Sequence, residues 1–250
     1  MSHDFLNLTS SLQRVYSDRI ALRPVSMADG WPLFEATKNP LFNKYLMWSK
    51  PKDASETLER IDMIADAVAK GQMSAVSVVL RSTGEWIGLF RFQPYRQFDD
   101  TLEIGFWSRD TFWQGRFGIE VGVLCVAAAF KLSTVSRIVG ASSPENRSST
   151  HGMQLGGLKP GEITYRRTED DEEVALQEFS VTRDEWIRSG HGEKLFNFRS
   201  RVYSHARGIR PQNTGPEQSG EGFQCSPPPD VQIATPPIGQ KILLCDMTDG

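Results

Sequence analysis

The chain has 250 residues, of which 39% are hydrophobic and 24% are charged, and its formal net charge is −3. This composition suits a soluble globular protein with one domain of ordinary size, or one domain with a tail. The slightly acidic balance gives no general electrostatic case for binding nucleic acid or a membrane surface.

Neither the cysteines nor the apolar segments indicate a disulfide framework, a metal site or a membrane span. Cys125, Cys225 and Cys245 lie far apart without CxxC spacing, so they predict neither a disulfide framework nor a metal site. The N-terminus lacks the pattern of a signal peptide, and the longest apolar run, 119–130, is shorter than the roughly 20 residues that span a bilayer. We therefore expect a cytoplasmic protein.

Hydrophobic periodicity predicts alternating helices and strands along the first half of the chain. The expected elements are a strand at 19–26, a helix ending near Thr37, a loop or short helical turn at 39–48, an amphipathic helix from Ser55 to Gly71, a hairpin of strands at 74–81 and 86–94, and a strand at 100–108.

The second half predicts a similar mixture. It contains a helix at 117–132, a strand at 136–142, a short helix at 147–156, a strand at 161–168, an exposed acidic hairpin tip at 168–173, a returning strand at 175–182 and a closing helix opened by the capping-box pair Thr182 and Glu185.

The composition changes beyond about residue 190. Residues 211–237 hold seven of the 14 prolines and show no amphipathic period. We predict one domain at 15–190, followed by a linker and a Pro-rich, disordered tail at 191–250. The basic and aromatic stretch 196–210 is interpreted as a linker or helix fragment, with partner or nucleic-acid binding as a weaker alternative.

A glycine-containing turn, WQGRFGIE at 113–120, lies between the strand-like EIGFW at 103–107 and the apolar helix. A helix N-terminus carries unpaired N–H groups and a positive dipole end, and glycine lets a phosphate approach the backbone closely. The turn therefore suits a pyrophosphate, with Arg116 adding charge-assisted hydrogen bonds. The alternative is a tight strand–helix turn that uses glycine for geometry alone.

The order of the elements and several motifs resemble the GNAT superfamily of acyl-CoA N-acetyltransferases. EIGFW, WQGRFGIE and PENRSSTHGMQLGGLKPG at 144–161 carry the resemblance, while DRIALRPVSMAD at 18–29 and TGEWIGLFRF at 83–92 are similar to the ribosomal-protein (Rim-type) branch. The resemblance implies an α+β fold, a single domain with a mixed, mainly antiparallel sheet and flanking helices. It also implies that the parallel strands 100–108 and 136–142 splay apart.

The same resemblance implies that acetyl-CoA is a cosubstrate and that no metal is needed. Its pyrophosphate would bind the turn, and its pantetheine arm would contact backbone of the first splayed strand. The residues expected to bind the cosubstrate are Phe106, Trp107, Gln114, Gly115, Arg116, Phe117, Gly118, Ile119 and Asn146. Arg116 departs from the family pattern, which places a glycine there when the last glycine of the turn is aligned with Gly118.

Two residues are candidates for proton transfer. Glu103 would accept the proton of the attacking amine, directly or through water; alternatively it is a cross-strand carboxylate paired with an arginine. Ser149 would hydrogen-bond the leaving thiolate; alternatively it is a residue in the first turn of a helix that satisfies backbone N–H groups.

The expected function is therefore acetyl-CoA-dependent N-acetylation of a primary amine by direct attack. The acceptor is a protein N-terminus or a small-molecule amine, and a homodimer is compatible with this interpretation. The alternative is a non-catalytic acyl-CoA-binding or protein-interaction module, which the departure at Arg116 and the long tail favour.

Overall fold

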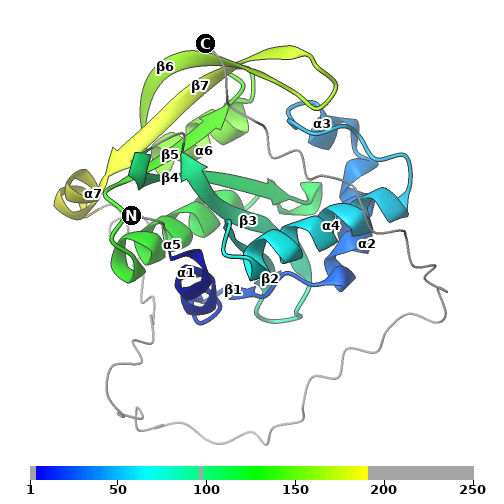
Figure 1. Cartoon of the computed structure of the whole chain (residues 1–250), viewed down its shortest axis with the longest axis horizontal. Coiled ribbons are helices and arrows are strands. Elements are labelled where there is room, and N and C mark those ends of the chain that lie inside the picture. Colours follow the sequence, from blue (N-terminus) through cyan, green and yellow to red (C-terminus); the bar gives the residue numbers. More distant parts are fainter. Residues whose placement is uncertain (1–3, 96–97, 191–250) are drawn as a thin grey trace, which may run out of the picture. The chain divides into compact units, whose positions relative to one another are not determined.

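One seven-stranded sheet forms the centre of the protein (Figure 1). The computed structural model describes residues 4–95 and 98–190. The strands lie in the order β1-β2-β3-β4-β5-β7-β6, and neighbours are antiparallel except for the parallel pair β4 and β5. Their bounds are β1 (Ile20–Arg23), β2 (Ser74–Leu80), β3 (Trp86–Tyr95), β4 (Phe98–Ser108), β5 (Arg137–Ser142), β6 (Lys159–Arg167) and β7 (Glu173–Thr182).

Helices cover both faces of this sheet. They are α1 (Phe5–Leu12), α2 (Gly30–Thr37), α3 (Pro40–Asn43), α4 (Ala54–Ala69), α5 (Phe117–Leu132), α6 (Arg147–Leu155) and α7 (Arg183–Ser189), with 3₁₀ turns η1 (Met27–Asp29) and η2 (Asp110–Phe112). One hydrophobic cluster joins α1 and α5 to the sheet, and a second joins α2 and α4 to it. The fold is thus the single mixed α+β domain that the sequence predicts.

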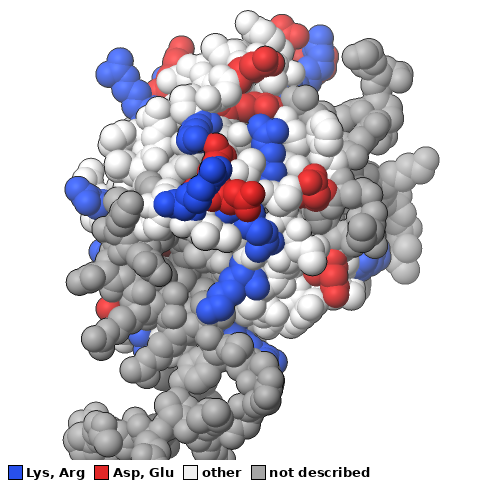
Figure 2. Space-filling model, turned by 90° about the vertical axis from the view of Figure 1, so that its left-hand side faces the viewer, with Lys and Arg blue, Asp and Glu red and all other residues white. Residues whose placement is uncertain are grey.

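Charged side chains of both signs are mixed on the side of the molecule where α7 lies. Figure 2 shows Lys and Arg beside Asp and Glu there. The helix α7 itself is tied to β6 by the ion pair of Lys159 and Glu185, at 2.7 Å. Within residues 4–95 and 98–190, no helix is long and apolar enough to cross a membrane, and no cluster of His, Cys, Asp and Glu could hold a metal ion.

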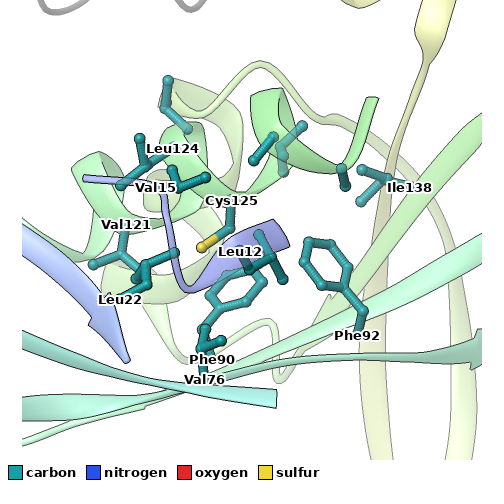
Figure 3. Packing of buried hydrophobic residues seen from close by; sticks show 14 of the residues in the cluster. Leu12, Val15, Leu22, Val76, Phe90, Phe92, Val121, Leu124, Cys125 and Ile138 are labelled. Carbon is teal, nitrogen blue, oxygen red and sulfur yellow. The ribbon is translucent and has the colours of Figure 1, made fainter. Parts of the chain in front are cut away.

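The helix α5 lies at the centre of the larger core. Figure 3 shows Cys125 of this helix pointing among Leu12 of α1 and Phe90 and Phe92 of β3. Cys125 is fully buried, and this burial raises the pKa of its thiol well above the usual range. Cys125 therefore behaves as a small hydrophobic residue of the core.

Capping residues fix several helix ends close to the positions that the sequence predicts. Asp53 caps α4 by accepting hydrogen bonds from the N–H groups of Ser55 and Glu56. Gly71 follows α4 with φ at +67°, a conformation that favours glycine. The expected capping box at the start of α7 is present. The helix α1 is not predicted by the sequence pattern, although its Phe5, Leu8 and Leu12 are buried in the core.

The parallel pair of strands separates before either strand ends. Pairing runs from Thr101 opposite Arg137 to Ile104 opposite Gly140 and then stops. Beyond it, residues 105–108 of β4 remain paired with β3 only, and residues 141–142 of β5 remain paired with β7 only. The predicted splay is confirmed, and we call this interruption the β4–β5 gap. The predicted tail at 191–250 and the stretch 196–210 lie outside the described residues.

Candidate functional site

The turn before α5 presents free backbone donors at one end of the β4–β5 gap. The first hydrogen bond of the helix runs from the N–H of Glu120 to the carbonyl of Arg116, at 3.1 Å. The N–H groups of residues 117–119 precede it, and such groups have no acceptor within a helix. Gly115 and Arg116 both adopt left-handed backbone, with φ of 73° and 63°. The chain thus turns sharply into a helix whose positive dipole end suits an anion.

Packing fixes the shape of this turn. The indole Nε1 of Trp113 donates to the carbonyl of Ser108 at 3.0 Å. The rings of Phe112 and Phe117 meet edge to face with their centroids 5.4 Å apart, and Phe112 is buried. The guanidinium of Arg19 donates to the carbonyl of Gly115. The anion site is therefore preorganised by its own residues.

The anion site and the β4–β5 gap adjoin each other. A Cβ atom placed on Gly118 would meet only the ring of Phe106, at 3.7 Å. Phe106 lies two residues beyond Ile104, the last residue of β4 that pairs with β5. An extended ligand with an anionic group at the turn can therefore lie along the unpaired backbone of β4.

The loop between β5 and α6 supplies polar groups on the other strand of the gap. Asn146 caps α6, and its Oδ1 accepts a hydrogen bond from the N–H of Ser149 at 3.2 Å. The side chain of Ser149 is half-buried, and its hydroxyl has no hydrogen-bond partner among the described residues. Ser149 therefore retains a hydroxyl that a ligand can use.

Glu103 lies in a network of charged side chains on the sheet face opposite α5. Its Oε1 accepts from Nη1 of Arg166 at 2.7 Å, and its Oε2 accepts from Gln93 at 3.3 Å. Arg166 also lies 3.5 Å from Glu178, whose carboxylate accepts from the hydroxyl of Tyr95. Burial alone lowers the pKa of the Arg166 guanidinium, but the charges of Glu103 and Glu178 outweigh it and raise this pKa. The arginine partner considered for Glu103 from the sequence is thus Arg166.

The acidic hairpin tip between β6 and β7 contacts the loop between α3 and α4. Figure 1 shows the hairpin reaching toward α3. The carboxylate of Glu169 accepts two hydrogen bonds from Arg60 of α4, at 3.0 and 2.8 Å. Asp170 accepts from the hydroxyl of Ser49 at 2.6 Å. Some of the stretch that the sequence predicts to be solvated is therefore docked. The same loop reaches the start of α6, since the hydroxyl of Tyr45 donates to the carbonyl of Glu145 at 3.3 Å.

Comparison with known proteins identifies this arrangement. Residues 19–159, more than half of the chain, match the family model described as an acetyltransferase (GNAT) domain. The chain belongs to this family.

One relative by sequence and several solved structures are also similar to this chain. An uncharacterized N-acetyltransferase p20 of Bacillus licheniformis is 27% identical over 138 residues, which are 55% of this chain and 78% of the relative. A GNAT-family acetyltransferase of Bacillus anthracis has a TM-score of 0.60 and 17% identity, with 68% of this chain and 98% of that chain covered. RimJ of Mycobacterium smegmatis, solved with CoA-disulfide, has a TM-score of 0.56 and 14% identity over 69% of this chain and 90% of that chain.

The GNAT fold brings the predicted residues together in two groups. Those expected to bind the cosubstrate lie at the turn, along the open stretch of β4 and at the start of α6; they are Phe106, Trp107, Gln114, Gly115, Arg116, Phe117, Gly118, Ile119 and Asn146. Trp107 also packs on the second core, with its ring 5.5 Å from that of Trp48. Glu103 forms the second group with the charged network on the sheet face opposite α5, and Ser149 lies in the first turn of α6.

Several residues around this GNAT site were not singled out from the sequence. Arg166 and Glu178 come from β6 and β7, and their proximity to Glu103 depends on the sheet order β4-β5-β7-β6. Arg19 precedes β1 and reaches a turn almost one hundred residues later, at a sequence separation of 96. Their only signal in the sequence is the alternation of charged and apolar residues along each strand.

Arg116 has a left-handed backbone, with φ of 63°, which is the conformation that glycine adopts most easily. Left-handed backbone disfavours residues that carry a Cβ. Arg116→Gly should therefore raise the free energy of unfolding by up to about 1 kcal/mol, as measured by urea denaturation. The same change removes a cation, so binding of CoA should become weaker and less dependent on salt.

Asp171→Gly is the matched control for this prediction, because Asp171 also has a left-handed backbone, with φ of 62°, at the hairpin tip. It should change stability without changing the affinity for CoA. An unchanged salt dependence in Arg116→Gly would contradict a role for the Arg116 charge.

Proposed function

We propose that the protein is an acetyl-CoA-dependent N-acetyltransferase that acts on a primary amine by direct attack. The observation that carries the proposal is the β4–β5 gap beside the preorganised anion site at α5. A pyrophosphate at the turn and an extended amide-containing arm along β4 use both features at once.

Acetyl-CoA supplies the acetyl group as a thioester, and the carbon–sulfur bond breaks as the new carbon–nitrogen bond forms. The residues of this chain bind, orient and exchange protons. The N–H groups at residues 117–119 bind the pyrophosphate. Backbone of Phe106, which has no paired strand on the β5 side, holds the arm and polarises the carbonyl oxygen.

Glu103 is the proposed acceptor of the amine proton, directly or through water. It lies in the last stretch of β4 that is still paired with β5, next to the point where the gap opens. Arg166 and Gln93 hold its carboxylate in one orientation. Its side chain is 12% exposed, which leaves it reachable while limiting competing water.

Ser149 is the proposed hydrogen-bond donor to the thiolate that leaves. Ser149→Ala should lower kcat by about tenfold or less, because a thiolate is already a fair leaving group. The affinity for acetyl-CoA should change little. Ser148→Ala, at an exposed neighbouring position of α6, is the control and should leave kcat unchanged. Steady-state thiol release measures kcat for both variants. An equal kcat in Ser149→Ala and the wild type would show that Ser149 has only a structural role in α6.

The acceptor is proposed to be a protein N-terminus or a small-molecule amine. One experiment tests both acceptor classes. The full chain is incubated with acetyl-CoA and a panel of short peptides with free N-termini, polyamines and aminoglycosides, and thiol release is measured. Release that depends on one amine class, with mass spectrometry of the acetylated product, would support the proposal.

The non-catalytic alternative predicts a different result in the same experiment. CoA would bind, and no amine in the panel would release thiol. Arg116 adopts the conformation that a glycine would have, so the turn keeps a shape that suits CoA under either hypothesis, and thiol release separates the two.

A further inference from the structure

A buried cluster under the anion site joins the start of β1 to the first turn of α5. Glu120 is 4% exposed and forms an ion pair with Arg19, whose Nε donates to Oε2 at 2.7 Å. The second carboxylate oxygen of Glu120 accepts from the hydroxyl of Ser17. Both carboxylate oxygens of Glu120, which is almost completely buried, thus accept hydrogen bonds from neighbouring side chains.

The same arginine holds the turn that precedes the helix. Both Nη1 and Nη2 of Arg19 donate to the carbonyl of Gly115 at 3.1 Å. Its guanidinium also lies over the ring of Phe117, with Cζ 4.2 Å from the centroid. Arg19 therefore contacts the two residues on either side of Arg116, at the point where the backbone is left-handed.

The segment that carries Arg19 is itself held rigidly. The N–H of Ser17 donates to the carbonyl of Ile20 at 2.9 Å, and the hydroxyl of Ser17 accepts from the N–H of Ile20 at 3.1 Å. Nη1 of Arg81 donates to the carbonyl of Ser17 at 2.9 Å. Arg19 thus extends from a backbone segment that is held in place on both sides.

We propose that Arg19, anchored by Glu120, is a positioning residue that holds the Gly115 carbonyl so that the N–H groups of the turn and of α5 converge on the pyrophosphate of acetyl-CoA. A peptide unit has its carbonyl and N–H on opposite sides, so fixing the Gly115 carbonyl on the protein side directs the N–H of Arg116 outward. Arg19 also offsets the negative charge of Glu120, which otherwise lies one turn from the bound anion. This inference rests on the proposed function.

The test measures how the affinity for CoA depends on Arg19, by calorimetry with the full chain. Arg19→Met keeps the stem on Phe117 and removes the guanidinium. It should weaken CoA binding about tenfold, the usual effect of losing hydrogen bonds to a charged group. KM for acetyl-CoA should rise in proportion. At saturating acetyl-CoA, kcat and KM for the amine should stay within about twofold of the wild type.

Two further variants separate positioning from charge. Arg19→Lys keeps the charge but lacks the planar fork that reaches Gly115 and Glu120 together. It should bind CoA as weakly as Arg19→Met does, and the deficit should persist at high salt. Glu120→Gln should give a similar loss, and the double variant Arg19→Met with Glu120→Gln should lose less than the sum of the two.

Arg23→Met is the matched control. Arg23 is the last residue of β1, the strand that Arg19 precedes. Its guanidinium pairs with the buried carboxylate of Asp29 and, within the described residues, makes no hydrogen bond or ion pair with the turn. It should lower the melting temperature and leave CoA affinity unchanged.

Each outcome bears on one hypothesis. If Arg19→Met binds CoA as tightly as the wild type, or if Arg19→Lys restores full affinity, the positioning role is wrong and the proposed function stands. If the wild-type chain itself fails to bind CoA, the proposed function fails first, which a titration of the wild type reveals before any variant is made.

Discussion

Replacing Gly118 with aspartate is expected to abolish acetyl-CoA binding while the domain stays folded. Gly118 lies in the first turn of α5, and a Cβ atom there would make only an ordinary contact with Phe106, at 3.7 Å. An acidic residue in a first helical turn is favourable to the helix itself. The new carboxylate would, however, occupy the place of the pyrophosphate and repel it.

Calorimetry with CoA and a melting curve together check this expectation. Gly118→Ala tests size without charge and should retain most of the affinity. Gly122→Asp adds the same charge one turn further along α5, at a glycine whose Cβ would meet nothing within 4 Å, and should weaken binding far less. Unchanged CoA affinity in Gly118→Asp would show that the pyrophosphate does not bind at this turn.

The second large effect is expected for Glu103→Gln. If Glu103 accepts the amine proton, this substitution should lower kcat by roughly 10²–10⁴-fold, the usual contribution of a general base. Glutamine has nearly the same shape and can still accept a hydrogen bond from Arg166, so CoA affinity should change little. In the wild type, the rate should rise with pH, because only the neutral amine attacks.

The neighbouring carboxylate supplies the control for Glu103→Gln. Glu178→Gln removes the other negative charge beside Arg166 and perturbs the same network. If disturbance of the network alone lowers kcat, both variants should show the same loss, whereas a base at Glu103 predicts a much larger loss in Glu103→Gln. Wild-type kcat in Glu103→Gln would leave Glu103 as an ion-pair partner of Arg166 only.

The elements that the sequence predicts best are those with strong local signals. The apolar run after the glycine turn predicts the bounds of α5 as the structure has them, Phe117–Leu132. Its boundaries are local, since the turn opens the helix and Ser133 ends it with an extended backbone. The helix α1 was missed because FLNLTSSL is short and its Asn, Thr and Ser residues have weak helix propensity; tertiary packing of Phe5, Leu8 and Leu12 stabilises it.

The candidate site was predicted incompletely for the same reason. The turn at 113–120 is contiguous in sequence, so its motif is visible without the fold. The side chains that hold it in place are not. Arg19 is 96 residues from Gly115, whose carbonyl it holds. Elsewhere in the site, Arg166 and Glu103 are 63 residues apart. Such pairs follow from strand order and register, which a single sequence does not reveal.

The position of the β4–β5 gap also limits what can add to its open backbone. An open strand edge is a template onto which another chain can add, and proteins commonly shield such edges. Here the unpaired backbone at 105–108 lies inside the sheet, with β3 paired on one side and β5 following on the other. A narrow ligand arm can reach it, whereas a strand of another molecule would have to force β4 and β5 further apart. The gap thus opens strand backbone to a small molecule without creating an additional sheet edge to which another strand could add.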